Sequence, residues 1–389
     1  MGEQHGFDLV LFGATGFTGE LTARYLARHL PEGGRWALAG RNRAKLEAVR
    51  DRLGASVPLL HADVTDPASL REIAEATKVV ITTVGPYLLY GAPLVAACAE
   101  VGTDYVDLTG EPEFFDRTYL RHHETAERTG ARIVHACGFD SVPHDLGVYY
   151  TVKQLPSGVP LRISGRLRTG ATFSGGTYSS ALTAFSRLLP MARAARERAR
   201  AEPRPARKVR TEIGVPHRDP ETGRWLVPLT TIDPQIVGLS GRLLASYGPD
   251  FHYRHYASFG SLPTVVGAAM GLGALVALAQ IPPVRKALSN LRKPGTGPSE
   301  DQRARSWFTV RFTGEGGGKR VVTEVAGGDP GYDETAKMLA ESALCLAFDE
   351  LPDTSGQVTT AAALGDALLA RLVEAGLVFR VVTGGTVRS

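Results

Sequence analysis

The sequence predicts an α/β protein in which an N-terminal Rossmann domain, built on a doubly wound parallel sheet, precedes a second α+β domain. Three observations carry this prediction. An apolar strand followed by a glycine-rich turn stands at the N-terminus, strand and helix patterns alternate up to about residue 150, and strands of period two follow. Alternation of strand and helix produces right-handed βαβ units and therefore a parallel sheet, whereas period-two strands are typical of an antiparallel one.

The first predicted strand, residues 9–12, runs directly into G-A-T-G-F-T-G. A continuous apolar run is typical of a strand that is buried on both faces. Gly13 permits a tight turn, Gly16 lets a pyrophosphate approach the backbone, and Gly19 lets the next helix pack closely. The first amides of that helix then point at the phosphates. The predicted cofactor contacts in this turn are Gly13, Thr15, Gly16, Phe17 and Gly19.

The end of the second predicted strand, residues 35–39, selects the cofactor. An NAD site usually has an acidic side chain here for the ribose 2′-hydroxyl, yet positions 37–46 contain no Asp or Glu. Arg41 instead offers a planar guanidinium that suits a 2′-phosphate, the alternative being a solvated basic turn. NADP(H) is therefore the predicted cofactor. Asp63, after the third strand, either contacts the adenine edge or caps the helix that begins near Pro67.

The pattern divides the chain into three regions. Residues 1–150 are predicted to be the NADP-binding domain and residues 151–330 an α+β substrate domain with a mainly antiparallel sheet. Residues 331–389 are predicted to add helices that pack back on the first domain. Within the second region, the arginine-rich stretch 187–210 is interpreted as a solvated surface arm.

Composition excludes several classes of function. The formal net charge of +4 is too small a bias to indicate nucleic-acid binding. Three widely spaced cysteines form neither a disulfide framework nor a zinc pattern, so no metal site is predicted. The first residues carry acidic side chains and no apolar core, so no signal peptide is predicted and a cytoplasmic location is expected.

One segment, residues 256–284, contains no formally charged residue, and its centre, residues 265–281, is apolar on every side. A spanning helix needs about 20 apolar residues, and glycines weaken a helix in water. Three interpretations stay open: a buried helix or subunit contact, a helix in the membrane interface, and a transmembrane span. Each provides an apolar surface that suits an acyl substrate better than a polar amino acid.

Three loops are expected at the carboxyl edge of the parallel sheet, where cofactor and substrate meet. The first contains Gly85 and Pro86, which would turn the chain beneath the nicotinamide, and Tyr87, which would lie near the hydride. The second, residues 104–111, contains Tyr105, Asp107 and Glu111, and the third, residues 136–145, contains Asp140 and His144. A reductase needs an aligned hydride, a polarising group and a proton donor. Tyr87 and His144 are the candidate donors and Asp140 would orient His144 or bind substrate; turn capping and core packing are the alternatives.

These loop sequences resemble the saccharopine dehydrogenase-like oxidoreductases, and most closely the actinobacterial trans-acting enoyl reductases. The likeness runs nearly end to end and includes F-G-A-T-G-F-T-G at 12–19, A-L-A-G-R at 37–41, T-T-V-G-P-Y at 82–87, G-T-D-Y-V-D-L-T-G-E at 102–111 and A-C-G-F-D-S-V-P at 136–143. The resemblance implies a Rossmann domain with NADP(H), membrane association and a link to complex lipid synthesis. It also implies a separate polyketide synthase partner that carries the chain to be reduced.

Three functions are therefore compared. The first is an NADPH-dependent reductase of an enoyl bond in a lipid-like acyl or polyketide intermediate, located in the cytoplasm or on the inner face of the plasma membrane. The second is an amino-acid or imine dehydrogenase of the saccharopine type. The third is a membrane-associated NADP-binding protein that handles lipid without turnover. The sequence determines neither the substrate nor whether the protein forms a homodimer.

Overall fold

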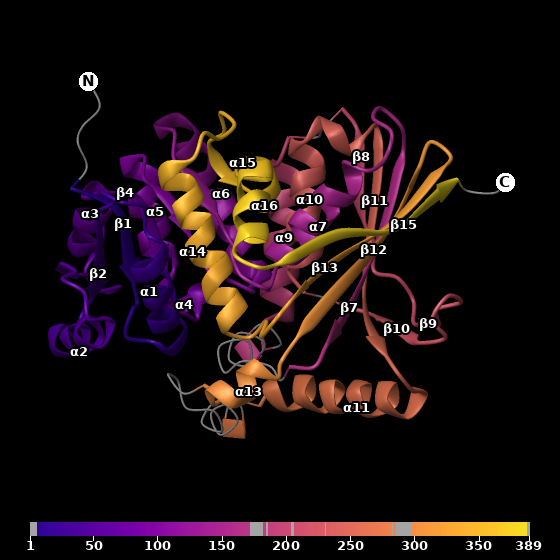
Figure 1. Ribbon diagram of the computed structural model, residues 1–389, viewed down its shortest axis with the longest axis horizontal. Helices are drawn as coiled ribbons and strands as arrows, with labels where there is room; N and C mark the ends of the chain where they lie inside the picture. Colours follow the sequence, from indigo (N-terminus) through magenta and orange to yellow (C-terminus); the bar gives the residue numbers. More distant parts are fainter. Residues whose placement is uncertain are drawn as a thin grey trace.

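The computed structural model consists of two sheets joined by helices (Figure 1). A parallel seven-stranded sheet lies beside a mixed, mostly antiparallel sheet, which confirms the predicted fold class. The residues that the structure describes are 6–171, 182–183, 186–203, 206–229, 231–281, 283–284 and 297–386.

The first sheet has the strand order β14-β6-β5-β4-β1-β2-β3, with every pair parallel. The order reverses between β1 and β4, which is where sheets of this kind bind their cofactor. The last strand, β14, comes from the C-terminal part of the chain, so the two ends of the chain share one sheet. Its strands are β1 (Phe7–Phe12), β2 (Trp36–Gly40), β3 (Leu59–His61), β4 (Thr77–Thr82), β5 (Asp104–Val106), β6 (Arg132–Val134) and β14 (Gly356–Val358).

Helices cover both faces of this sheet because both sets of alternating side chains are apolar. Leu9 and Leu11 of β1 belong to the core formed with α1 (Phe17–His29), α2 (Arg43–Leu53) and α14 (Asp333–Phe348). Val10 and Phe12 belong to the opposite core, formed with α3 (Pro67–Glu75), α5 (Ala92–Val101) and α6 (Pro112–Thr129). The unbroken apolar run at residues 9–12 is thus explained by burial on two sides.

The second sheet has the order β15-β13-β12-β7-β11-β10-β9, with β8 also paired to β11. Only the β7–β11 and β8–β11 pairs are parallel. The helix α7 (Val142–Val152) packs against β12 so closely that a side chain at Gly147 would lie 2.3 Å from the Phe312 ring. The strands are β7 (Leu161–Thr169), β8 (Lys208–Thr211), β9 (His217–Arg218), β10 (Trp225–Pro228), β11 (Asp250–Phe259), β12 (Phe308–Gly316), β13 (Lys319–Gly327) and β15 (Val378–Thr386).

The remaining described helices connect the two sheets or flank them. Helix α10 lies between α7 and β8, and α15 and α16 follow β14 (Figure 1). Their bounds are α4 (Tyr87–Tyr90), α9 (Leu188–Ala201), α10 (Asp233–Leu243), the short 3-10 helix η1 (Ala245–Tyr247), α11 (Leu262–Ala279), α13 (Glu300–Ala304), α15 (Thr360–Ala363) and α16 (Gly365–Glu374).

The arginine-rich stretch is not a solvated arm, because α9 packs along α6. The side chain of Arg198 is buried, and its guanidinium lies 3.2 Å from the carboxylate of Asp116. The same guanidinium lies over the rings of Phe115 and Tyr119, at 4.5 and 4.3 Å from their centroids. An ion pair and aromatic faces together compensate an arginine for its lost hydration. The composition of residues 187–210 does not predict that Arg198 is buried or which side chains it contacts.

The apolar segment forms the end of β11 and then a separate helix, α11, which lies along the lower edge of the molecule in Figure 1. Only 6% of this helix is buried, and Ala279 is its single fully buried residue. The prediction that this segment is a helix buried in the core of the protomer is therefore wrong. The helix is long and apolar enough to cross a membrane by length and composition.

Replacing Arg198 by Ala should lower the free energy of unfolding by about 3–5 kcal/mol, because the Asp116 carboxylate would stay buried without its partner. The matched control is Arg43→Ala, which breaks an exposed pair with Glu47 and should cost less than about 0.5 kcal/mol. Urea unfolding of the two variants measures the difference. Equal, small effects would contradict the buried ion pair.

Candidate active site

The first turn of the parallel sheet has the shape that a pyrophosphate requires. Gly13 has a φ of 97°, and a side chain there would lie 2.8 Å from both Thr83 Oγ1 and Val84 Cγ2. A side chain at Gly19 would lie 2.2 Å from the Gly13 carbonyl oxygen, so α1 packs directly on the turn. Gly16 caps α1 without a side-chain hydrogen bond, which leaves the first helical amides available for an anion. The turn therefore fits the phosphates of a dinucleotide.

Two other predicted contacts flank this turn. Thr15 is exposed at the tip of the turn. The ring of Phe17 instead contacts Tyr332 at 4.8 Å between centroids, and the Arg303 guanidinium lies 5.4 Å from it. The Phe17 ring is thus occupied by α13 and the start of α14, which leaves its backbone amide as its contribution to a cofactor site.

The residues predicted to recognise the adenosine end lie at the ends of neighbouring strands. Arg41 follows β2 and is exposed. Asp63 follows β3, and its carboxylate accepts hydrogen bonds from the Thr65 amide and hydroxyl at 2.9 and 2.8 Å. These bonds, and more weakly the charge of Arg41, lower the pKa of Asp63. Helix α3 is capped by Asp66, so the alternative role of Asp63 as its cap is wrong.

Glu111 shapes the loop that contains Gly85 and Pro86. Its two carboxylate oxygens accept hydrogen bonds from the amides of Tyr87 and Leu88, at 3.1 and 2.8 Å. The peptide bond between Gly85 and Pro86 is cis, and Gly85 is exposed. A buried carboxylate therefore holds the start of α4 behind an accessible loop at the carboxyl end of β4.

Tyr87 is buried behind this loop. Its side chain is only 5% exposed, and its hydroxyl donates to the Thr82 carbonyl and accepts from the Leu108 amide, both at 3.1 Å. Burial and the charge of Asp107 raise the pKa of the hydroxyl well above its ordinary value. A phenol that is satisfied on both sides by backbone groups holds two loops together. We therefore discard the predicted role of Tyr87 as a proton donor.

Asp107 positions the loop that carries Asp140. Its Oδ2 lies 2.7 Å from His135 Nδ1. Its Oδ1 accepts hydrogen bonds from the amides of Thr109 and Ala136, at 3.0 and 2.9 Å. Because Ala136 opens the loop after β6, this fully buried carboxylate links the loops after β5 and β6.

The structure brings His144 together with two residues of the second domain that sequence reasoning missed. Nδ1 of His144 lies 2.8 Å from Oδ1 of Asp233, although the two groups are not aligned for an ideal hydrogen bond. The ring of His255, from β11, stacks on His144 with centroids 4.4 Å apart and planes 26° apart. All three side chains are buried. Asp233 is followed by Pro234 and has the pattern of a helix start, so no sequence signal indicates this meeting.

Burial and neighbouring charges determine which groups of this His144–Asp233–His255 cluster are ionised. Burial is the largest single influence on Asp233 and opposes its ionisation, but the charge and hydrogen bond of His144, with smaller contributions from His255 and Thr231, together lower the pKa of Asp233. Burial and His144 lower the pKa of His255 to about 3, so His255 is neutral. Nε2 of His144 is buried and has no hydrogen-bond partner in the described part of the chain. The cluster therefore offers an imidazole held at one nitrogen and unpaired at the other.

Asp140 connects this cluster to the cofactor edge. Burial and the charge of Asp233 raise the pKa of Asp140 to about 7. Its Oδ2 would lie 3.3 Å from a side chain placed on Gly110, the residue before Glu111. Since Glu111 holds the chain just after Pro86, the cluster adjoins the loop predicted to lie beneath the nicotinamide.

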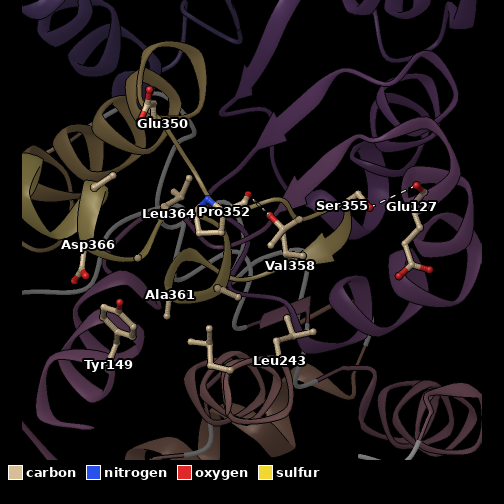
Figure 2. Close-up of a pocket in the computed structure, with 15 residues that line it drawn as sticks. Glu127, Tyr149, Leu243, Glu350, Pro352, Ser355, Val358, Ala361, Leu364 and Asp366 are labelled. Atoms are coloured by element: carbon tan, nitrogen blue, oxygen red, sulfur yellow. Dashed lines mark hydrogen bonds between the residues drawn. The ribbon is translucent and has the colours of Figure 1, made fainter. Parts of the chain in front are cut away.

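A cavity of about 480 Å³ lies elsewhere and is not part of this site (Figure 2). It is lined by residues of α7, α10, α15 and the loop before β14, among them Tyr149, Leu243 and Ser355. The lining runs from Ser355, before β14, past Val358 to residues of α15 and α16, so the cavity lies along the outer side of the edge strand β14, away from the glycine turn after β1. Cofactors of this fold bind at the carboxyl edge, and the chemistry belongs there.

Comparison with known proteins agrees with this geometry. Residues 9–134 match the family model of the saccharopine dehydrogenase NADP binding domain. The class is therefore that of NADP-dependent oxidoreductases, and the predicted cofactor, NADP(H), is confirmed.

A relative in Mycobacterium tuberculosis, named as a trans-acting enoyl reductase, is 42% identical over 95% of this chain and 96% of its own. The trans-acting enoyl reductase of Mycobacterium ulcerans is 37% identical over 96% and 97% of the two chains. The chain belongs to the trans-acting enoyl reductase family, as its loop sequences predicted. Saccharopine dehydrogenase (L-Glu forming) from Saccharomyces cerevisiae shares the fold, with a TM-score of 0.58, 13% identity and coverage of 97% and 100%.

Arg41→Ala should weaken NADPH binding by roughly tenfold to hundredfold, because one charge-assisted contact to the 2′-phosphate is lost. NADH binding should be unchanged. Calorimetric titration of both nucleotides measures this, with Arg43→Ala as the control for a nearby exposed arginine. Equal losses for NADPH and NADH would show that Arg41 does not read the 2′-phosphate.

Asp140 should make the folded protein lose stability as the pH rises from the ordinary pKa of 3.8 to about 7. Over this interval the folded chain keeps a proton that the unfolded chain releases, so unfolding becomes easier as pH increases. Asp140→Asn should lack this particular loss. Thermal unfolding of both proteins across the interval tests the prediction, and an identical decline in the variant would contradict it.

Proposed function

We propose that the protein reduces the carbon–carbon double bond of an enoyl thioester, using NADPH, on a lipid-like acyl chain carried by a separate polyketide synthase. The names of the relatives support the reaction class, and the word trans-acting supports a separate synthase. The observation that carries the proposal is the buried His144–Asp233 pair beside the carboxyl edge of an NADP-binding sheet.

Reduction of an enoyl thioester places a hydride on the β-carbon and a proton on the α-carbon, while the thioester carbonyl takes up the charge that develops between these events. NADPH, when bound at the glycine turn, supplies the hydride. His144 is the group proposed to deliver the proton, from the nitrogen that has no protein partner. Asp233 holds the other nitrogen and stabilises the protonated ring. Neutral His255 covers one ring face, and Asp140 is coupled to His144 and Asp233 through their charges.

The surroundings of His144 favour an acyl thioester over an amino acid. The ring of Phe139 lies 6.1 Å from His144 and 4.9 Å from Phe308, edge to face in both cases. These aromatic rings suit a neutral, apolar chain. A dicarboxylic amino acid would instead meet repulsion from the ionised Asp233.

The proposal places the protein in the cytoplasm, in peripheral contact with the inner face of a membrane. The support is the exposed apolar helix α11, which is long enough to meet lipid along its length. A homodimer stays a prediction from the sequence.

His144→Asn should lower kcat for enoyl thioester reduction by about 10²–10⁴-fold, the usual contribution of a general acid, with the Kd for NADPH unchanged. Asp233→Asn should also lower kcat, because the protonated ring loses its counter-charge. Tyr253→Phe is the matched control, since that hydroxyl contacts His255 at 3.2 Å and not His144. NADPH oxidation with thioesters of increasing chain length measures all four proteins.

Unchanged turnover in His144→Asn would assign the proton to another source. If NADPH binds tightly and no enoyl thioester is reduced, lipid handling without turnover becomes the better conclusion. Turnover restricted to polar keto acids with amines would favour the saccharopine-type alternative.

A further inference from the structure

Helix α11 exposes apolar side chains in every direction around its axis. At 100° per residue, Leu262, Leu272 and Leu278 point to well-separated sides, and they are 48%, 50% and 40% exposed. No Asp, Glu, Lys or Arg lies within the helix. A flat protein partner would cover one side of such a helix and leave the others in water. Lipid covers all of them, since a helix that is apolar all round belongs in a core or a membrane.

The flanking segments fix how the helix meets lipid. Its start follows β11 after two residues. The next described helix, α13, is tied to the same body, because Arg303 lies 2.9 Å from Asp333. The chain between them contains Arg285 and Lys286, outside the described residues, and no second apolar stretch that could return across a bilayer. The helix therefore lies lengthwise within one leaflet, where acyl chains surround it, and does not cross the bilayer.

Aromatic and basic side chains gather at the edge of the second sheet where α11 begins. Register places Trp225 opposite Phe259, and Thr169 opposite Phe308, at this edge. Trp307, 40% exposed, has the Arg168 guanidinium 5.6 Å from its ring. Tryptophan and arginine are the residues that concentrate at the boundary between headgroups and acyl chains. These side chains lie outside α11, and they too favour contact with a lipid surface.

The cofactor edge lies on the same side of the molecule as this surface (Figure 1). Helix α13 lies at the same lower edge of Figure 1 as α11, and its Arg303 contacts the ring of Phe17 at the start of α1. When α11 contacts the bilayer, the glycine turn and the neighbouring loops therefore face the lipid.

We propose that α11 docks the protein on an anionic lipid bilayer, together with the edge of the second sheet that carries Trp225 and Trp307. The active-site edge then faces the membrane. Resting on the proposed function, the substrate class is then an enoyl thioester whose long acyl tail is taken from the membrane surface. A short, polar substrate would reach the site from solution, so it would not require the active-site edge to face the membrane.

Flotation of the full-length protein with vesicles of phosphatidylcholine and phosphatidylglycerol tests the docking. The double variant M270E/L272E should bind these vesicles at least about tenfold more weakly, because two carboxylates would enter the acyl boundary. Neither side chain is buried, so folding should be unaffected. Val373→Glu, at a 49% exposed apolar residue of α16, is the control and should bind like wild type. Vesicles of phosphatidylcholine alone should bind more weakly.

Two further readouts separate docking from catalysis. With a short, soluble enoyl thioester, M270E/L272E should keep the wild-type rate; with a long-chain thioester held in vesicles it should lose rate in proportion to binding. Brominated lipid should quench wild-type tryptophan fluorescence and quench Trp307→Phe less. Docking without any turnover would refute only the proposed function. Absence of vesicle binding, equal binding by M270E/L272E, or a dimer that this variant dissociates would overturn the docking proposal.

Discussion

The arrangement of the two sheets depends on the buried carboxylate of Asp145. Ser240 of α10 donates to one of its oxygens at 2.5 Å, while the Thr360 hydroxyl and the Ala361 amide donate to the other at 2.8 Å. Burial raises its pKa, and these donors act against that rise. Two elements distant in sequence, α10 and α15, are thereby fixed to the first turns of α7. A carboxylate in this position is stable only when all its partners are in place.

This constraint decides where chemistry is available. His144 precedes Asp145 on α7, and Asp233 opens the α10 helix that Ser240 also belongs to. Fixing α10 to α7 therefore sets the separation of His144 and Asp233. The parallel sheet holds the cofactor turn, but the proposed proton donor is complete only when α10 and β11 pack against α7.

The exposed helix shows a different relation between sequence and structure. The absence of charge in residues 256–284 was visible at once, and it correctly marked an apolar surface. Whether that surface is internal or external depends on what packs against it. Helix α11 contacts β10 and β11, and Ala279 at its end is its single buried residue. The same composition would serve equally well in a core, so composition alone was ambiguous.

The sequence by itself determined the Rossmann sheet, the glycine turn and the cofactor, because these depend on local patterns: an apolar run, glycine spacing, and Arg41 where an acid would select NAD. Family membership followed from loop sequences of the same local kind. Tertiary structure alone decided that Tyr87 is a core residue, that Arg198 is buried, and that His144 meets Asp233 and His255. These outcomes depend on contacts between residues far apart in the chain, and the period of a strand or helix does not encode its neighbours.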